Sequence, residues 1–288
     1  MVPAGRAGIL AFINPATRQV SSSIGGFTAD PKYDGGHDTG ITSVDEGAGL
    51  LFVVDRSTKK LSVIDPGKRA VVATAPLAEG PDYVRYVAPT SELWVTEPDA
   101  EQLEVFALAT GDVPRVTRTT VIKFHKGPEE LVVDAARGRA YANSWKSETF
   151  AVDLRSHAVV ATWKNACKKA RGVAFDPAAG FLFMGCSEGG AVALDVTTGR
   201  EVGAAPGGEG VDIIAYSPSR RHLYVPGGKS RTMTIMAVSQ KGSLTPLGTV
   251  PTADKAHCVT TDDRGTTYVC DPDHGQLLAI RDPFVPSF

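Results

Sequence analysis

Short apolar segments alternate with turns along the whole chain. Residues 170–207 show the pattern most clearly, because RGVAF, FLFMGC, AVALD and EVGAA are separated by DPAAG, SEGG and VTTGR. Each segment is a few residues long and is bounded by Gly, Pro, Asp or Ser, which is typical of β-strands joined by turns. The segment therefore predicts a unit of four consecutive strands.

The same four-stranded unit recurs through the chain. Its second strand is matched by LLFVVD, ELWVTE, RAYANS, FLFMGC, HLYVPG and TTYVCD, at 50–55, 92–97, 139–144, 181–186, 222–227 and 266–271. Its third strand is matched at 61–65, 103–108, 149–153, 191–195, 233–238 and 277–282. A four-stranded repeat of about 40–50 residues is the mark of β-propeller blades, whose sheets cover each other's apolar faces. We expect an all-β fold, a single β-propeller domain over residues 1–288.

The number of blades depends on the two ends of the chain. Residues 8–25 match the third and fourth strands of the unit, and residues 257–282 supply the first three strands of a last blade. We expect seven blades with an incomplete first blade, so that either a preceding segment is missing or the propeller closes with an exposed edge. The alternative is six blades, with the N-terminal strands completing the last sheet. The expected divisions are a partial blade at 1–36 and blades at about 37–79, 80–126, 127–166, 167–206, 207–253 and 254–288.

The second strands, such as LFVVD, LYVPG and TYVCD, resemble the strand that names the YVTN/YncE-like β-propeller family. GPDYV (80–84), GPEELVVD (127–134), RGVAFDP (171–177) and GVDIIAYSP (210–218) are similar to the family as well, and the resemblance covers essentially the whole chain. The chain departs from the family at its missing first strand and at HDTGITSVD (37–45), where the histidine stands early. The resemblance implies a bacterial protein that is periplasmic or secreted. Because related propellers include lactonases, lyases, cofactor carriers and interaction modules, it does not decide the activity.

Composition excludes some partners. Hydrophobic residues make up 42% and charged residues 22% of the chain, as in an ordinary globular protein. The formal net charge of −2 gives no general attraction to nucleic acid or to an acidic membrane. No apolar run approaches the roughly 18 residues of a membrane span. We expect neither a nucleic-acid partner nor a membrane span, and the sequence does not indicate an oligomeric state.

Two of the four cysteines stand on either side of a predicted turn. Cys258 and Cys270 flank DDRG, so antiparallel pairing would bring them close together on adjacent strands. A disulfide would need suitable geometry and an oxidising compartment. The alternative is a pair of free, half-buried thiols.

Polar residues recur near the start of the first strand, about five positions before its turn. First strands line the central channel of a propeller, so the repeat predicts that these residues meet at one end of the channel. His37 and Asp38 are expected to occupy the corresponding place in the preceding blade. The series, which we call the predicted rim, comprises Asp82, Glu129, Arg171, Asp212 and His257.

Three interpretations of the predicted rim remain open. In the first it is a wet channel in which Glu129, Arg171 and Asp212 form alternating ion pairs, and a ligand can still bind there. In the second His257 is a general base, Arg171 stabilises negative charge, and Glu129 or Asp212 orients the histidine. In the third Glu129, Asp212 and His257 bind a divalent metal ion, although the neighbouring arginine argues against it.

The function that we predict is a scaffold whose polar funnel binds a small polar molecule or a protein partner. Asp82, Arg85, His37 and Asp38 are its further ligand-binding candidates. The alternative is a lactonase- or lyase-like hydrolytic enzyme with its site at the funnel mouth. No cofactor is expected, and the motifs GxSxG, GxxxxGK[ST], HExxH and CxxCH do not occur.

Other polar residues receive simpler interpretations. The basic cluster in KNACKKAR, which comprises Lys164, Lys168, Lys169 and Arg171, is interpreted as a solvated loop rather than a nucleic-acid patch. Trp145 is expected to pack within a blade. Glu130 is expected to face away from the channel, and His222 to have no partner at metal-binding spacing.

Overall fold

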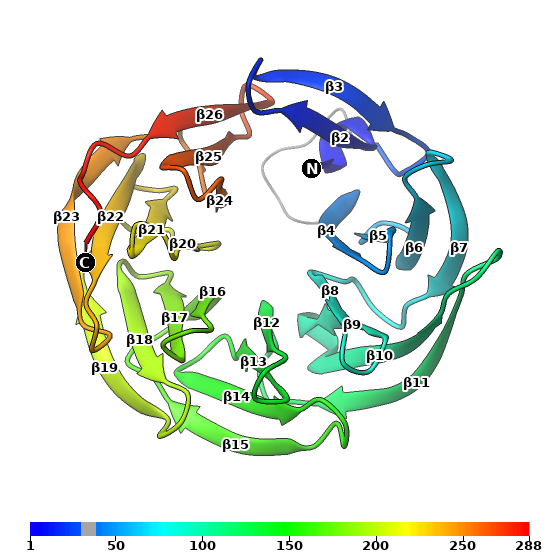
Figure 1. Cartoon of the computed structure of the whole chain (residues 1–288), viewed down its shortest axis with the longest axis horizontal. Helices are drawn as coiled ribbons and strands as arrows, with labels where there is room; N and C mark the ends of the chain where they lie inside the picture. The colour runs from blue at the N-terminus through cyan, green and yellow to red at the C-terminus, as the bar shows by residue number, and fades with distance from the viewer. Residues whose placement is uncertain (30–38, 288) are drawn as a thin grey trace. The chain divides into compact units, whose positions relative to one another are not determined.

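A computed structural model describes residues 1–29 and 39–287. Within these residues the strands form seven antiparallel sheets that are consecutive in sequence, five with four strands and the first and last with three (Figure 1). In each sheet the strands pair in chain order. This is the architecture of a seven-bladed β-propeller, so the predicted fold is confirmed and the six-bladed alternative is wrong. His37 and Asp38 lie outside the described residues.

The first sheet contains β1 (Val2–Ala4), β2 (Ile9–Asn14) and β3 (Gln19–Ile24). The second contains β4 (Ile41–Gly47), β5 (Leu50–Asp55), β6 (Lys60–Asp65) and β7 (Ala70–Pro76). The third contains β8 (Val84–Val87), β9 (Glu92–Glu97), β10 (Gln102–Ala109) and β11 (Arg115–Lys123). Two short 3₁₀ helices connect strands in this part of the chain: η1 (Gly5–Ala7) between β1 and β2, and η2 (Pro98–Ala100) between β9 and β10.

The remaining four sheets repeat the plan. The fourth contains β12 (Leu131–Asp134), β13 (Arg139–Asn143), β14 (Glu148–Asp153) and β15 (Val159–Lys164). The fifth contains β16 (Ala170–Asp176), β17 (Phe181–Cys186), β18 (Ala191–Asp195) and β19 (Arg200–Ala205). The sixth contains β20 (Ala215–Ser217), β21 (His222–Gly227), β22 (Thr232–Val238) and β23 (Leu244–Pro251). The seventh contains β24 (Val259–Thr261), β25 (Thr266–Asp271) and β26 (Gln276–Arg281).

The repeat pattern located these strands because the turn residues set their boundaries. Asp176 accepts hydrogen bonds from the N–H groups of Ala178 (3.1 Å) and Ala179 (3.0 Å), and the turn ends at Gly180 with φ of 73°. Such a side-chain turn followed by a left-handed glycine reverses the chain between two strands. The predicted second strands consequently coincide with β5, β9, β13, β17, β21 and β25.

The chain divides into two compact units, residues 1–140 with 152–158 and residues 141–151 with 159–288. The first unit has an apolar core between its second and third sheets, which includes Phe52, Val63, Val84 and Leu93. The second unit has a comparable core between the fifth and sixth sheets, with Phe183 and Leu223 fully buried. Burial of such side chains is the main driving force that holds neighbouring sheets together.

Disulfides reinforce the second unit. Cys258 forms a disulfide with Cys270 across the β24–β25 hairpin, with 5.5 Å between their Cα atoms. Of the two alternatives from the sequence, a disulfide and a pair of free thiols, the structure has the disulfide. Cys167 pairs with Cys186, with a Cα–Cα distance of 5.1 Å, and this link was not expected. In the described part of the chain, no helix has the length and apolar character that crossing a membrane requires.

Candidate functional site

In the second unit, backbone hydrogen bonds join the start of β16 to the segment before β20, and that segment to the one before β24. The N–H of Gly172 in β16 donates to the carbonyl oxygen of Asp212 (2.7 Å), and the N–H of Ile213 donates to the carbonyl oxygen of His257 (2.9 Å). The residue that follows Arg171 is therefore bonded to Asp212, and the residue that follows Asp212 is bonded to His257. The repeat thus brings these three members of the predicted rim together through their backbones.

A glycine lets the fifth and sixth sheets approach each other at this point. A Cβ atom on Gly185 of β17 would lie 2.7 Å from Cγ1 of Val211 and 2.9 Å from Cγ2 of Ile214. Carbon atoms in van der Waals contact are separated by about 3.5–4.0 Å, so a larger residue would push the segment that carries Asp212 away.

Arg171 is held by one contact to its side chain and one to its backbone. Its guanidinium carbon lies 5.7 Å from the ring centre of Trp145, a cation–π arrangement. Its carbonyl oxygen accepts a hydrogen bond of 2.9 Å from Nδ2 of Asn143, whose Oδ1 accepts from Thr149 Oγ1 (3.0 Å). Asn143, at the end of β13, and Thr149, in β14, are fully buried, so these two strands hold the Arg171 backbone in place.

His257 has a fixed imidazole orientation. Its Nδ1 lies 2.5 Å from the carbonyl oxygen of Lys255. A carbonyl oxygen can only accept, so the proton of the neutral ring resides on Nδ1 and the basic nitrogen is Nε2. Histidine in this tautomer can act as a base or accept a hydrogen bond through Nε2.

In the first unit, Asp82 has a partner that the sequence did not reveal. Arg56, which follows β5, forms an ion pair with the carboxylate of Asp82, and the two side chains are only 14% and 17% exposed. Nε of Arg56 also donates to the carbonyl oxygen of Pro81 (3.1 Å). Asp82 is therefore neutralised by a residue of the preceding blade, and the repeat pattern could not show this because Arg56 lies in a loop.

Arg85 and Glu130 form a second partly buried ion pair in this unit. Nη2 of Arg85 on β8 lies 2.5 Å from Oε1 of Glu130, and the glutamate side chain is 7% exposed. The guanidinium also lies 5.3 Å from the ring centre of Tyr83. Arg85 reaches Glu130 from the preceding blade, a partner that the sequence interpretation did not identify. Glu129, its neighbour in the chain, is buried as well.

The sequence interpretation overlooked Glu97, which ends β9 close to Asp82. Its carboxylate accepts hydrogen bonds from Nε2 of Gln102 (2.5 Å) and from the N–H of Glu79 (3.1 Å), and its side chain is fully buried. Burial raises the pKa of Glu97 to about 7, and the charge of Glu104 contributes in the same direction. The sequence signal was a glutamate at the end of an otherwise apolar second strand.

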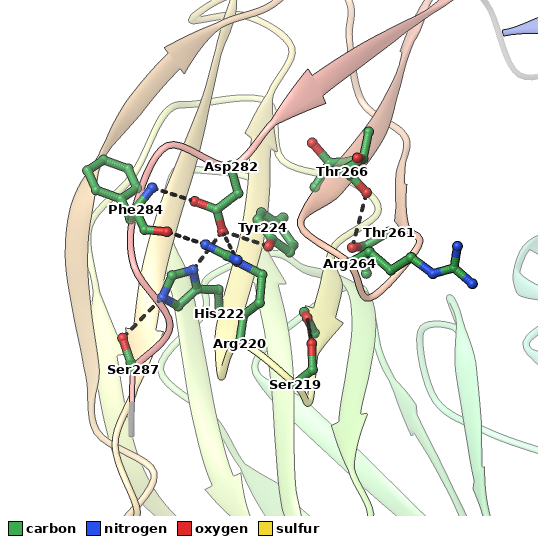
Figure 2. A network of polar contacts seen from close by, with 12 residues as sticks. Ser219, Arg220, His222, Tyr224, Thr261, Arg264, Thr266, Asp282, Phe284 and Ser287 are labelled. Carbon is green, nitrogen blue, oxygen red and sulfur yellow. Dashed lines mark hydrogen bonds and ion pairs between the residues drawn. The ribbon is translucent and has the colours of Figure 1, made fainter. Parts of the chain in front are cut away.

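A separate polar network surrounds Asp282 in the second unit (Figure 2). Oδ2 of Asp282 accepts hydrogen bonds from Nε of Arg220 (2.9 Å), Nδ1 of His222 (2.7 Å) and the hydroxyl of Tyr224 (2.8 Å). Nε2 of His222 contacts Oγ of Ser287 at 3.1 Å. Burial raises the pKa of Asp282, but the bonds from His222, from the Phe284 N–H and from Tyr224 outweigh it and hold the pKa below its usual range.

The order of contacts from Ser287 through His222 to Asp282 is that of a serine hydrolase. However, the His222 side chain is 0% exposed, so a substrate cannot reach it in this structure. The Asp282 carboxylate, which would have to orient His222, also binds Arg220 and Tyr224. The Ser287 N–H also donates to the Arg220 carbonyl oxygen (2.9 Å). The network therefore fastens the C-terminal segment to β21.

The structure joins part of the predicted rim and leaves the rest as a prediction. Arg171, Asp212 and His257 are adjacent in the second unit, whereas Asp82 and Glu129 belong to the first. The expected ion pairs among Glu129, Arg171 and Asp212 stay a prediction. Over residues 1–29 and 39–287, no group of three or more His, Cys, Asp or Glu side chains is arranged to hold a metal ion.

Comparison with known proteins bears on the fold. No protein-family model matches the chain, and no curated protein matches its sequence. A chain of hydrazine synthase from Kuenenia stuttgartiensis is similar over 96% of this chain and 90% of its own, with a TM-score of 0.75 and 13% identity. A chain of the mitotic checkpoint complex is similar over 97% of this chain and 82% of its own, with a TM-score of 0.79 and 15% identity.

A third similar structure is a single propeller domain. The Cps50 (Swd1) β-propeller domain of Myceliophteria thermophila matches 96% of this chain and 92% of its own, with a TM-score of 0.76 and 12% identity. At these identities the likeness establishes the seven-bladed β-propeller fold and nothing about activity.

Proposed function

We propose that the chain is a YVTN/YncE-like propeller scaffold, one domain over residues 1–288, that binds a small polar molecule or a segment of a partner protein. The observation that supports the proposal is the pair of backbone hydrogen bonds that links the start of β16, which carries Arg171, to the segments before β20 and β24, which carry Asp212 and His257. A cation, a carboxylate and an imidazole on backbone segments that are hydrogen-bonded to one another offer donors and acceptors in fixed positions, as polar binding sites require.

Two further features support this proposal. Trp145 and Asn143 hold Arg171 before any ligand arrives, so little side-chain entropy is lost on binding. The disulfides Cys167–Cys186 and Cys258–Cys270 suit an oxidising compartment, which supports a periplasmic or secreted protein. Asp82 and Arg85, in the first unit, stay separate ligand-binding candidates of the proposal.

A thermal-shift screen of sugars, carboxylates, amino acids and short peptides tests the proposal. We expect hits with the wild type, and we expect His257→Ala and Arg171→Ala to abolish their shifts. Arg264→Ala is the matched control, because Arg264 is exposed in the turn between β24 and β25. A screen without hits, or hits whose shifts survive both site variants, would overturn the proposal.

A hydrolytic enzyme is the second candidate, and the orientation of His257 favours it. With the proton on Nδ1 facing Lys255, the basic Nε2 is the nitrogen that a general base needs. In this proposal Arg171 stabilises the developing negative charge, and Asp212 supports the imidazole.

A panel of lactones and esters distinguishes the two candidates. The enzyme proposal expects turnover that His257→Ala abolishes with little change in the melting temperature, since the imidazole side chain is only partly buried. A blank panel, or turnover that persists in His257→Ala, removes the enzyme proposal and leaves the binding scaffold.

A further inference from the structure

Exposed basic residues gather where the loops of the fourth and fifth sheets meet. The sequence cluster in KNACKKAR included Lys164, but Nζ of Lys164 lies 2.7 Å from Oε1 of Glu148 and is therefore engaged on the outer strand β15. Lys146, from the loop after β13, takes its place beside the other basic residues. We call the resulting group the basic platform, and it comprises Trp145, Lys146, Lys168, Lys169 and Arg171.

The loops that carry the basic platform are tied to one another. The N–H of Ala170 donates to the carbonyl oxygen of Lys146 (3.3 Å), and the N–H of Ser187 donates to that of Lys169 (2.9 Å). The disulfide between Cys167 and Cys186 links the same loops. Because the backbone is already fixed, a ligand of the platform has to order only the ends of the lysine side chains.

Lysines outnumber acidic residues in the loops that form the platform. Lys146, Lys168 and Lys169 are exposed, and Glu188 of the adjoining loop, whose two oxygens accept from the N–H groups of Lys168 and Lys169, offsets only one of these three charges. Glu148 is engaged by Lys164. The lysine side chains therefore present a positive surface on a chain whose formal net charge is −2.

Trp145 gives the platform an apolar part. The indole is half-buried and lies against the Arg171 guanidinium at 5.7 Å. Tryptophan and arginine are enriched among the residues that dominate protein–protein binding energy, because they combine a large contact area with polar groups. A peptide chain can thus pack on the ring while its carboxylates face the lysines.

We propose that the basic platform binds an acidic segment of a partner protein, rich in Asp and Glu. The inference rests on the proposed function, because it names the partner that this end of the second unit binds. A nucleic acid suits the surface less well, since recognition of its backbone calls for an extended basic track, whereas the overall charge of this chain is slightly negative.

Fluorescence anisotropy with a labelled Glu/Asp-rich peptide of about twelve residues tests the inference. We expect binding that weakens markedly between about 20 mM and 200 mM salt, because exposed charge pairs are screened. Lys168→Ala/Lys169→Ala should weaken binding by about tenfold. The matched control is Lys241→Ala/Arg264→Ala, which removes the same charge from exposed turns elsewhere in the second unit and should leave binding unchanged.

The outcomes separate this inference from the proposed function. If the lysine pair and the control pair weaken binding equally, or no peptide binds, the basic platform is not the site, whereas hits in the small-molecule screen would still support the scaffold. If His257→Ala abolishes peptide binding and the lysine variant does not, the partner contacts the funnel alone and the inference is wrong. A single-stranded DNA of equal charge that binds more tightly than the peptide would overturn the choice of an acidic protein.

Discussion

Replacing Asp282 by asparagine should destabilise the protein strongly, because this carboxylate is the centre of a buried network. Its side chain is 0% exposed, and one oxygen accepts hydrogen bonds from Arg220, His222 and Tyr224. The substitution removes the charge and leaves the Arg220 guanidinium, which is 13% exposed, without its counter-ion. Removing one partner of a buried ion pair costs about 3–5 kcal/mol in the free energy of unfolding.

The expected change in melting temperature follows from the size of the chain. An unfolding entropy of about 2.1 cal/mol/K per residue, over 288 residues, converts 3–5 kcal/mol into a decrease of about 5–8 °C. Asp254→Asn is the matched control, because Asp254 pairs with Arg231 at 3.2 Å while their side chains are 42% and 66% exposed. An exposed pair contributes at most about 1 kcal/mol, so this control should shift the midpoint by less than about 2 °C.

The acid dependence of stability provides a second readout for Asp282. Its hydrogen bonds hold the pKa in the folded protein below the ordinary value, so its contribution is present above about pH 4 and is lost as the pH falls through the folded pKa. Differential scanning calorimetry at pH 7 and pH 3 should show the gap between the wild type and Asp282→Asn shrinking in acid. Equal effects of Asp282→Asn and Asp254→Asn, or a gap that does not depend on pH, would refute the reasoning.

Three further variants test the described contacts. Burial raises the pKa of Glu97 to about 7, so the wild type loses stability as the pH rises from about 4.5 to 7. Urea unfolding should therefore show that Glu97→Gln has a free energy of unfolding up to about 3 kcal/mol higher than the wild type at pH 8, but little higher at pH 5. Cys167 and Cys186 are 19 residues apart, so replacing both by serine should cost about 3 kcal/mol in the same assay, and an unchanged midpoint would contradict this. Gly185→Val would place atoms within 2.7 Å of Val211 and should cost about 1–3 kcal/mol, whereas a neutral effect would show that this contact is not tight.

The strands and their order could be predicted from the sequence because both depend on local chemistry. Asp176 and Gly180 fix their turn through contacts within the turn itself, and similar turns run from Asp134 to Gly138 and from Asp262 to Gly265. The proximity of Cys258 and Cys270 followed in the same way from a hairpin, since Val259 pairs with Val269 one residue further in.

The partners of the polar residues could not be predicted, because they come from neighbouring blades. Arg56 reaches Asp82, and Arg85 reaches Glu130, across the boundary between blades, and no periodicity within one repeat encodes which loop residue lies there. His222 was dismissed because its partner Asp282 is 60 residues away. Arg171 and Asp212 are linked through the backbone hydrogen bond of Gly172, and the predicted rim stays a prediction.

The central claim is that the second unit binds a polar ligand beside His257, and NMR of the histidine side chains tests it most directly. The chain has six histidines, and the His257 signal is assigned by its absence from His257→Gln. We expect the free protein to show the Nδ1–H tautomer at His257, and each hit from the small-molecule screen to shift this signal in a saturable manner, but not in Arg171→Ala. Hits that shift only other histidine signals, or that leave all of them unchanged, would contradict the claim.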